Sequence, residues 1–175
     1  MLNALQVVHE LNSLLPPCQR PEHTEGYEGF YHLVGVKGEV EQASCEYIIR
    51  DHSRVKFEEK KRFIEAAVAL LQQKYGEGVI KLTLKDQYYN MREMVEPYPE
   101  VIDKAFQAMR EADVTPIVRP IRGGTDGARL SYMGLPCPNL FTGGMNFHGK
   151  YEYCSLNTMQ KAVRTLLNLV KLWAE

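Results

Sequence analysis

The sequence predicts a mixed α/β protein, in which a ferredoxin-like βαββαβ unit without its first strand is followed by part of a parallel α/β layer. Three observations support this prediction. Two long stretches carry apolar residues at helical spacing, and the chain between them has the pattern of a β-hairpin. Beyond residues 94–99, short strand patterns alternate with helical ones. This change of pattern predicts two domains, residues 1–95 and 96–175.

The first domain begins with an amphipathic helix and a hairpin. Residues 2–15 repeat leucine and valine every three or four positions, and the helix is expected to stop at Pro16 and Pro17. A polar stretch rich in turn-forming residues follows. Residues 30–36 and 39–50 are then predicted as two antiparallel strands joined by a short turn.

A second helix and a third strand complete the first domain. The Ser53 hydroxyl can cap a helix that runs to a stop at Gly76. Residues 79–84 alternate apolar and polar side chains, so they are predicted as a strand with one face in water. The order α-β-β-α-β lacks the first strand of a βαββαβ unit, and this absence is expected to leave an open sheet edge or a slot.

The second domain is predicted to alternate helices and strands around a sheet. Such alternation is typical of a parallel layer. The predicted elements are helices near residues 101–111, 128–133 and 156–174 and strands near 116–119 and 139–142.

Composition and charge exclude several classes of partner. The 175 residues include 21 Lys and Arg against 22 Asp and Glu, a net charge of −1, which gives no electrostatic basis for binding nucleic acid or an anionic membrane. No apolar run approaches the length of a membrane span, and the first residues lack the pattern of a secretory signal. The four cysteines have no metal-binding spacing, so reduced thiols and a cytoplasmic location are expected.

A glycine-rich segment, residues 121–127, is one candidate binding loop. It surrounds Thr125 and Asp126 with glycines that include Gly124, immediately before a helical pattern. Glycines let a backbone approach a ligand closely, and the start of a helix offers free amide groups to an anion. The alternative is a tight turn in which Asp126 caps the helix. When the loop is considered by itself, this alternative is favoured.

His148 is the candidate metal ligand. It lies in the segment 142–149, after a predicted strand end, where ligands of α/β proteins commonly bind. The alternative is a histidine that only makes hydrogen bonds within a turn.

Arg92 is the candidate anion-binding residue, with Asn90 beside it near the predicted domain boundary. A guanidinium at such a junction can hold a carboxylate through two parallel hydrogen bonds. The alternative is a surface ion pair with Glu93 or Glu96, worth about 0–1 kcal/mol.

Together these motifs resemble the tripeptide aminopeptidases of the co-catalytic di-zinc aminopeptidase/carboxypeptidase family. The resemblance rests on TEGYEGFYHL, YYNMRE and IRGGTDGARLSYMGLPCPNLFTGG followed by N-x-HGK-x-E, and it covers essentially the whole chain. It implies a catalytic α/β domain that holds two zinc ions and a smaller βαββαβ lid. Residues 1–95 would be the lid without its first strand, and residues 96–175 the C-terminal portion of the catalytic domain.

The resemblance also implies roles for the candidate residues. His148 matches the last zinc-ligand histidine, and the turn at 124–126 matches a turn that lines the substrate. Arg92, with Asn90 beside it, matches the lid arginine that binds the substrate carboxylate. The partner of the complete enzyme would be a small peptide that loses its N-terminal residue.

The sequence departs from the family pattern in its metal ligands and general base. A two-zinc centre needs several converging carboxylates and imidazoles. No His-x-Asp pair is present, and the nearest match, residues 23–25, lies in an acidic loop. The pair Glu58 and Glu59 is expected on the solvent face of a helix. We therefore expect no catalytic residue in this chain, and weak or no zinc binding by it alone.

Three functional hypotheses remain open. The first is a later part of a longer zinc peptidase, inactive alone. The second is one half of a split enzyme that another chain completes. The third is a non-catalytic interaction module, which could form a homo-oligomer through the exposed lid edge.

Overall fold

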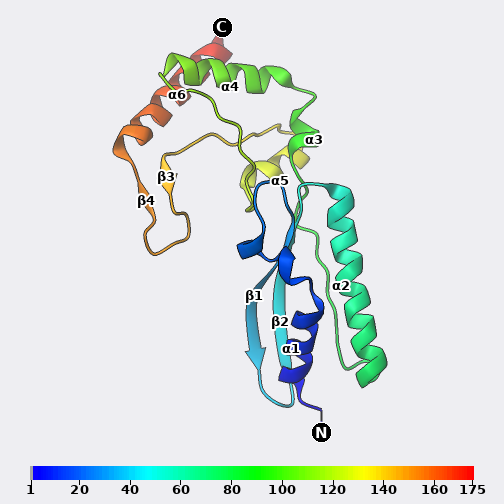
Figure 1. Cartoon of the computed structure of the whole chain (residues 1–175). Coiled ribbons are helices and arrows are strands. Elements are labelled where there is room, and N and C mark those ends of the chain that lie inside the picture. The colour runs from blue at the N-terminus through cyan, green and yellow to red at the C-terminus, as the bar shows by residue number, and fades with distance from the viewer. Residues whose placement is uncertain (1) are drawn as a thin grey trace. The chain divides into compact units, whose positions relative to one another are not determined.

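The protein is described by a computed structural model of residues 2–175, which divides into two compact units (Figure 1). One unit ends at Tyr89 and the other begins at Asn90. Each contains helices and one two-stranded antiparallel sheet, so the predicted mixed α/β class is confirmed. The assignment of the units to a lid and part of a catalytic domain stays a prediction.

The first unit contains a hairpin and two long helices. Strands β1 (Phe30–Gly38) and β2 (Ala43–Arg50) pair antiparallel, with an irregularity between Leu33 and Gly35. Helix α1 (Ala4–Leu14) precedes the hairpin, and α2 (Arg54–Tyr75) follows it. Short 3-10 turns, η1 (Pro17–Gln19) and η2 (Pro21–His23), join α1 to β1. As predicted, the Ser53 hydroxyl caps α2 by accepting from the Lys56 amide at 3.4 Å.

The core of this unit lies between the two helices and one face of the hairpin. Val7 and Leu11 of α1 pack against Val68 and Leu71 of α2, and Cys45 of β2 packs on the same cluster. A second cluster contains Leu15, Tyr31 and Ile64, with Tyr47 and Ile49 of β2 packed on it.

The predicted strand at residues 79–84 does not form. This segment is extended but belongs to no sheet, because β2 is hydrogen-bonded to β1 alone among the described strands. Its apolar residues Ile80, Leu82 and Leu84 pack on the core clusters, and the Gln72 side-chain amide donates to the Ile80 carbonyl at 2.8 Å. The alternating pattern therefore reflects packing on the helices, whereas a strand also needs a neighbouring backbone.

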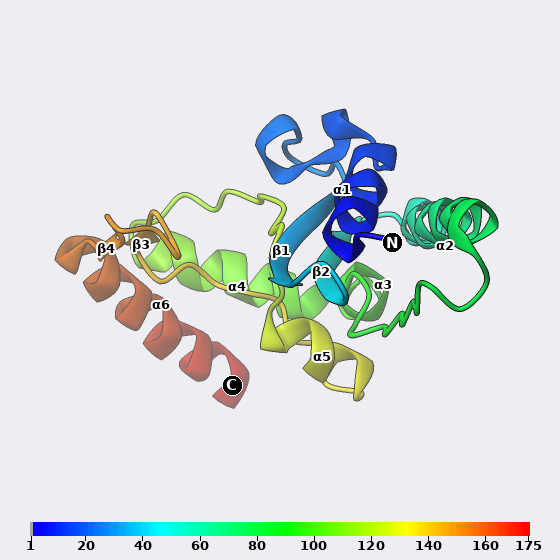
Figure 2. The ribbon, with the colours of Figure 1, turned by 90° about the horizontal axis from the view of Figure 1, so that it is seen from below.

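The second unit is built around two adjacent helices, α4 (Pro99–Glu111) and α6 (Leu156–Ala174), which run side by side (Figure 2). Buried alanines of α4, including Ala108, allow the close approach. Lys104 Nζ donates to the Leu172 carbonyl at 2.6 Å, and the Asn168 side chain donates to the Ala108 carbonyl at 3.3 Å. The remaining elements are α3 (Arg92–Val95), α5 (Asp126–Tyr132), β3 (Gly144–Met145) and β4 (Tyr153–Cys154).

The predicted parallel layer is absent from residues 90–175. The segments 116–119 and 139–142 are not strands, and the only sheet in this part of the described chain is the antiparallel pair β3–β4. Ile117 and Val118 are 69% and 73% exposed. A parallel strand requires neighbours on which to form its ladder, and residues 90–175 supply none here.

Two further findings concern expectations from composition. The four cysteines are all free thiols. Among the helices of residues 2–175, none has both the length and the apolar character needed to cross a membrane.

Candidate functional site

Arg92 begins α3 with its side chain in solvent. The side-chain oxygen of Asn90 accepts a hydrogen bond from the Arg92 amide at 3.1 Å, which fixes the start of the helix. Arg92 Nε donates to Glu96 Oε1 at 2.6 Å, so Glu96 is the ion-pair partner. The two side chains are 72% and 60% exposed. An exposed pair of this kind contributes only about 0–1 kcal/mol, so a ligand carboxylate can replace Glu96 at small cost.

The glycine-rich turn leads directly into α5, and its cap differs from the predicted one. Thr125 is the N-cap, and its hydroxyl accepts from the Ala128 amide at 3.4 Å. The Asn139 side chain donates to the same hydroxyl at 3.3 Å. Asp126 is instead the exposed first residue of the helix. The shorter threonine side chain caps because Thr125 is the last residue with extended backbone angles, which the N-cap position requires.

Close packing fixes the rest of α5. A side chain at Gly127 would collide with the Cys137 carbonyl oxygen, so only glycine fits there. The buried Ser131 hydroxyl donates to the Gly127 carbonyl at 2.7 Å and accepts from the Cys137 amide at 3.0 Å. The turn at 124–126 therefore leads into a helix whose position is fixed by these contacts.

Tyr132 connects this helix to the Arg92 segment. Its hydroxyl donates to the Asn90 carbonyl at 3.0 Å. One helix therefore carries the 124–126 turn at its start and holds the segment before Arg92 at its end, about 10 Å away along the axis. Sequence reasoning missed Tyr132, because residues 42 positions apart have no local spacing that reveals their contact.

His148 lies in the loop between β3 and β4. Its backbone has a left-handed φ of 62°, and its amide donates to the Glu152 carboxylate at 2.8 Å. The side chain is exposed. Other hydrogen bonds of this loop also stay within it: the Asn146 side chain donates to the Tyr151 carbonyl at 3.2 Å, and the Gly149 amide donates to the Asn146 carbonyl at 3.0 Å. The structure therefore links the segment of Asn90 and Arg92 to the 124–126 turn through α5, whereas the hydrogen bond of the His148 amide lies within its own loop.

The donor groups of this chain do not fit a two-metal centre. Over residues 2–175 there is no group of three or more His, Cys, Asp or Glu side chains that could hold a metal ion. Glu58 is ion-paired with Lys61 at 3.1 Å on α2, and Glu59 is exposed on the same helix, as expected for a solvated helix face. The Glu152 carboxylate accepts from the backbone amide of His148, and these two residues alone would not supply the four or so ligands of a closed zinc site.

The outer face of α6 is apolar and exposed. Side chains of this kind recur at helical spacing along its whole length. They are Leu156, Met159, Val163, Leu166, Leu167, Val170 and Trp173. A continuous apolar stripe on a helix is typical of a surface that another part of a protein covers.

Comparison with known proteins gives consistent matches along the chain. The model of peptidase family M20/M25/M40 matches residues 20–172. Peptidase T of Alkaliphilus oremlandii is 55% identical over all 175 residues, and those of Bacillus velezensis and Clostridium acetobutylicum are each 53% identical. The chain spans 43% of the length of each of these relatives.

A solved structure has a similar fold. The crystal structure of aminopeptidase PepT from Bacillus cereus matches 99% of this chain with a TM-score of 0.62, over 46% of its own length. At 15% sequence identity, this match concerns the fold alone.

Proposed function

Because this chain belongs to peptidase family M20/M25/M40, we propose that it forms the substrate-anchoring part of a peptidase T-like metallopeptidase that removes the N-terminal residue from tripeptides. The observation that carries this proposal is the similarity to peptidase T along all 175 residues. The complete enzyme would work in the cytoplasm with zinc.

Arg92 is the proposed anchor for the carboxylate of the peptide. Its guanidinium is exposed, and its present partner Glu96 is held only by a surface ion pair. A ligand carboxylate that accepts two parallel hydrogen bonds from the guanidinium would be held more strongly. Asn90, Tyr132 and the turn of Gly124, Thr125 and Asp126 would position and line the same peptide.

Peptide hydrolysis itself is not assigned to this chain. The reaction forms a bond between a water oxygen and the peptide carbonyl carbon, breaks the carbon–nitrogen bond and passes a proton to the leaving amine. His148 would supply one zinc ligand of the complete enzyme. The other ligands and the general base are expected on polypeptide outside these 175 residues, since residues 2–175 contain no metal-binding group.

A split enzyme is the second candidate, and the exposed apolar face of α6 is consistent with it as well as with the first candidate. That stripe needs a covering surface, which the rest of a catalytic domain would provide whether it belongs to the same or another polypeptide. The two candidates differ only in whether the rest of the catalytic domain belongs to the same polypeptide or to another one.

A complementation assay tests both candidates. The purified chain is incubated with a tripeptide and zinc, alone and with a polypeptide that carries the His-x-Asp and Glu-Glu motifs. We expect no chelator-sensitive hydrolysis by the chain alone, and hydrolysis by the mixture under the split-enzyme candidate. His148→Ala should abolish the gained activity, and His9→Ala, an exposed position on α1, should not.

Two results would contradict these proposals. Chelator-sensitive cleavage of the tripeptide by the chain alone, retained through further purification, would show that this chain is catalytically active by itself. No gain on mixing over a wide concentration range would exclude the split enzyme.

A further inference from the structure

The loop between β3 and β4 contains two residues in a backbone conformation that L-amino acids seldom adopt. Asn146 and His148 have φ values of 56° and 62°. Gly149, which could take such an angle without steric cost, lies outside this left-handed region. Non-glycine residues stay in the region only where surrounding contacts hold them. The loop therefore needs contacts that fix the backbone at these two positions.

The strand pairing beside the loop is too short to fix the backbone at His148. β3 and β4 pair through only two residues each, and a ladder of this length is marginal in water. Two backbone hydrogen bonds make turns within the loop, from the Gly149 amide to the Asn146 carbonyl at 3.0 Å and from the Glu152 amide to the Gly149 carbonyl at 3.2 Å. Neither bond includes an atom of His148.

Side chains supply the remaining contacts. The Glu152 carboxylate accepts a hydrogen bond from the His148 amide at 2.8 Å. The Asn146 side chain donates to the Tyr151 carbonyl at 3.2 Å. Each left-handed residue is thus joined to one of two neighbouring residues near the end of the loop. The bond at His148 is of the stronger kind, because its acceptor is charged.

The backbone angles at residue 148 decide where its side chain points. The imidazole is exposed, and the direction of the bond that joins it to the main chain follows from φ and ψ at His148. A change from the left-handed region to the usual negative φ would turn this bond relative to the rest of the loop. A group that holds the His148 amide therefore controls the direction of the ring without touching it.

We propose that Glu152 is the positioning residue of His148. Its carboxylate holds the His148 amide, keeps the backbone at this position left-handed and thereby directs the imidazole. The inference deepens the proposed function, on which it rests for the role of His148 in the complete enzyme. The backbone geometry belongs to this chain alone, so it can be measured without the rest of the enzyme.

Nuclear magnetic resonance on the full chain without added metal provides the test. Three-bond couplings across the N–Cα bond of residue 148 distinguish a positive φ from a negative one. In Glu152→Ala we expect couplings typical of a negative or averaged φ, and exchange of the His148 amide with solvent about 10- to 100-fold faster. Glu152→Gln keeps a side-chain oxygen that can accept from the amide, so its values should lie between those of Glu152→Ala and the unaltered chain.

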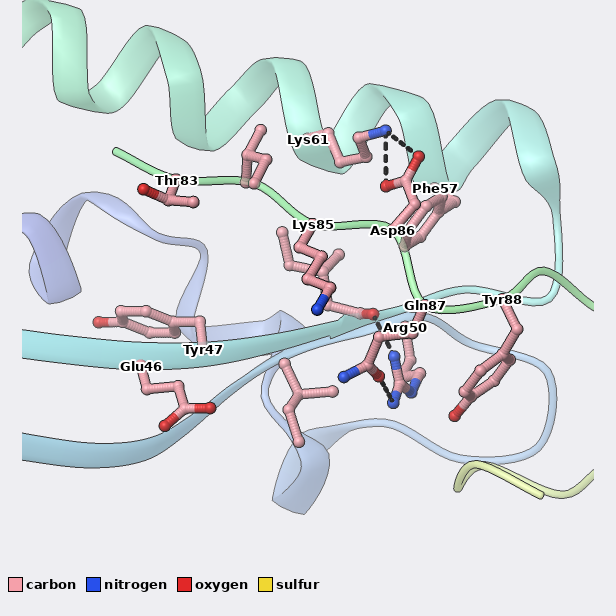
Figure 3. A pocket seen from close by; sticks show the side chains of 13 residues that line it. Glu46, Tyr47, Arg50, Phe57, Lys61, Thr83, Lys85, Asp86, Gln87 and Tyr88 are labelled. Carbon is pink, nitrogen blue, oxygen red and sulfur yellow. Dashed lines mark hydrogen bonds and ion pairs between the residues drawn. The ribbon is translucent and has the colours of Figure 1, made fainter. Parts of the chain in front are cut away.

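Two control variants accompany this measurement. Tyr151→Ala changes an 83% exposed side chain beside Glu152 and keeps the carbonyl that Asn146 contacts. Glu46→Ala removes the same charge in the first unit, where Glu46 is an exposed residue of a groove lined by residues 46–50 of β2 and residues 83–88 (Figure 3). Both should leave the couplings and the amide exchange of residue 148 unchanged. Unaltered signals of the buried alanines of α4 would show that Glu152→Ala is folded.

The complementation assay gives a second readout. Where the mixed polypeptides hydrolyse the tripeptide, Glu152→Ala should lower kcat about 10-fold or more with KM little changed, because a misdirected ring affects the reaction and not the anchor. Glu152→Gln should recover part of this loss, and Tyr151→Ala should show none.

Two outcomes would overturn the proposal. They are a positive φ at residue 148 that is retained in Glu152→Ala, and a loss of that angle in Tyr151→Ala equal to the loss in Glu152→Ala. Failure of the proposed function would look different. Unchanged activity of His148→Ala in the mixture, with the couplings as expected, would contradict the proposed role of His148 and leave the backbone role of Glu152 supported.

Discussion

Arg92 and Glu96 lie one helical turn apart, and the arginine Nε donates to the glutamate carboxylate at 2.6 Å. Glu96 is thus bound to the guanidinium that we propose as the binding group for the substrate carboxylate. A substrate must compete with this internal acid, and because both side chains are in solvent the competition costs little.

Arg92→Ala should lower kcat/KM of the complete or reconstituted enzyme about 10- to 100-fold. Hydrogen bonds to charged groups contribute about 1.5–3 kcal/mol, and every 1.4 kcal/mol corresponds to a factor of ten. Steady-state kinetics on a tripeptide measure the effect. Glu96→Gln, which removes the competing carboxylate, should leave KM unchanged or lower it. Unchanged kcat/KM in Arg92→Ala would show that the anchor is assigned wrongly.

Tyr132→Phe should raise KM a few-fold while kcat is retained. The hydroxyl holds the Asn90 carbonyl at 3.0 Å, and without it the segment before Arg92 is less well fixed. The same change should destabilise the second unit by about 0.5–1.5 kcal/mol, as urea unfolding would measure. Tyr27→Phe, at a 60% exposed tyrosine of the first unit, is the control and should alter neither quantity.

Leu71→Ala should destabilise the first unit by about 2–5 kcal/mol. Leu71 is 1% exposed in the cluster that joins α1, α2 and β2, so truncation leaves a cavity. Leu70→Ala, next to it on α2 but 53% exposed, should change the free energy of unfolding by less than about 1 kcal/mol. Equal losses in the two variants would contradict the assignment of this core.

Acid should weaken the contact between α1 and α2. The Glu10 carboxylate accepts hydrogen bonds from Lys74 Nζ at 2.6 Å and Tyr75 Oη at 2.5 Å, and both bonds lower the pKa of Glu10 from its usual 4.5. A lowered pKa means that the stabilisation is complete above pH 4.5 and is lost as pH falls through the folded-state pKa.

Urea midpoints at pH 7 and pH 3 measure this dependence. Glu10→Gln should lose less stability between the two pH values than the unaltered protein. Glu65→Gln, an exposed position on α2, should behave like the unaltered protein. A Glu10→Gln variant that loses as much stability as the unaltered protein would show that the Glu10 contact does not cause the acid dependence.

The long helices and the hairpin follow from local patterns. The helix predicted at 156–174 is found at Leu156–Ala174, and the Ser53 cap of α2 is found as predicted. A helix forms its hydrogen bonds within one segment, and a hairpin forms them across a short turn, so neighbouring residues decide both.

The predicted strands at 79–84, 116–119 and 139–142 do not form, because a strand depends on residues outside its own segment. A strand forms only when its backbone makes hydrogen bonds to a neighbouring strand. The alternation of apolar residues in one segment does not show whether such a neighbour is present. The bond from Tyr132 to Asn90 also depends on the folded arrangement, because the two residues are 42 positions apart.

The sequence by itself determined the peptidase family, the helices and the candidate anchor Arg92. Motifs and the helical spacing of apolar residues can be recognised from residues that are close together in the sequence. Only the tertiary structure decided that Tyr132 holds the Asn90 carbonyl, that residues 79–84 pack on the core without joining a sheet, and that a groove lies beside β2. These are contacts between distant segments, and they exist only when packing brings those segments together.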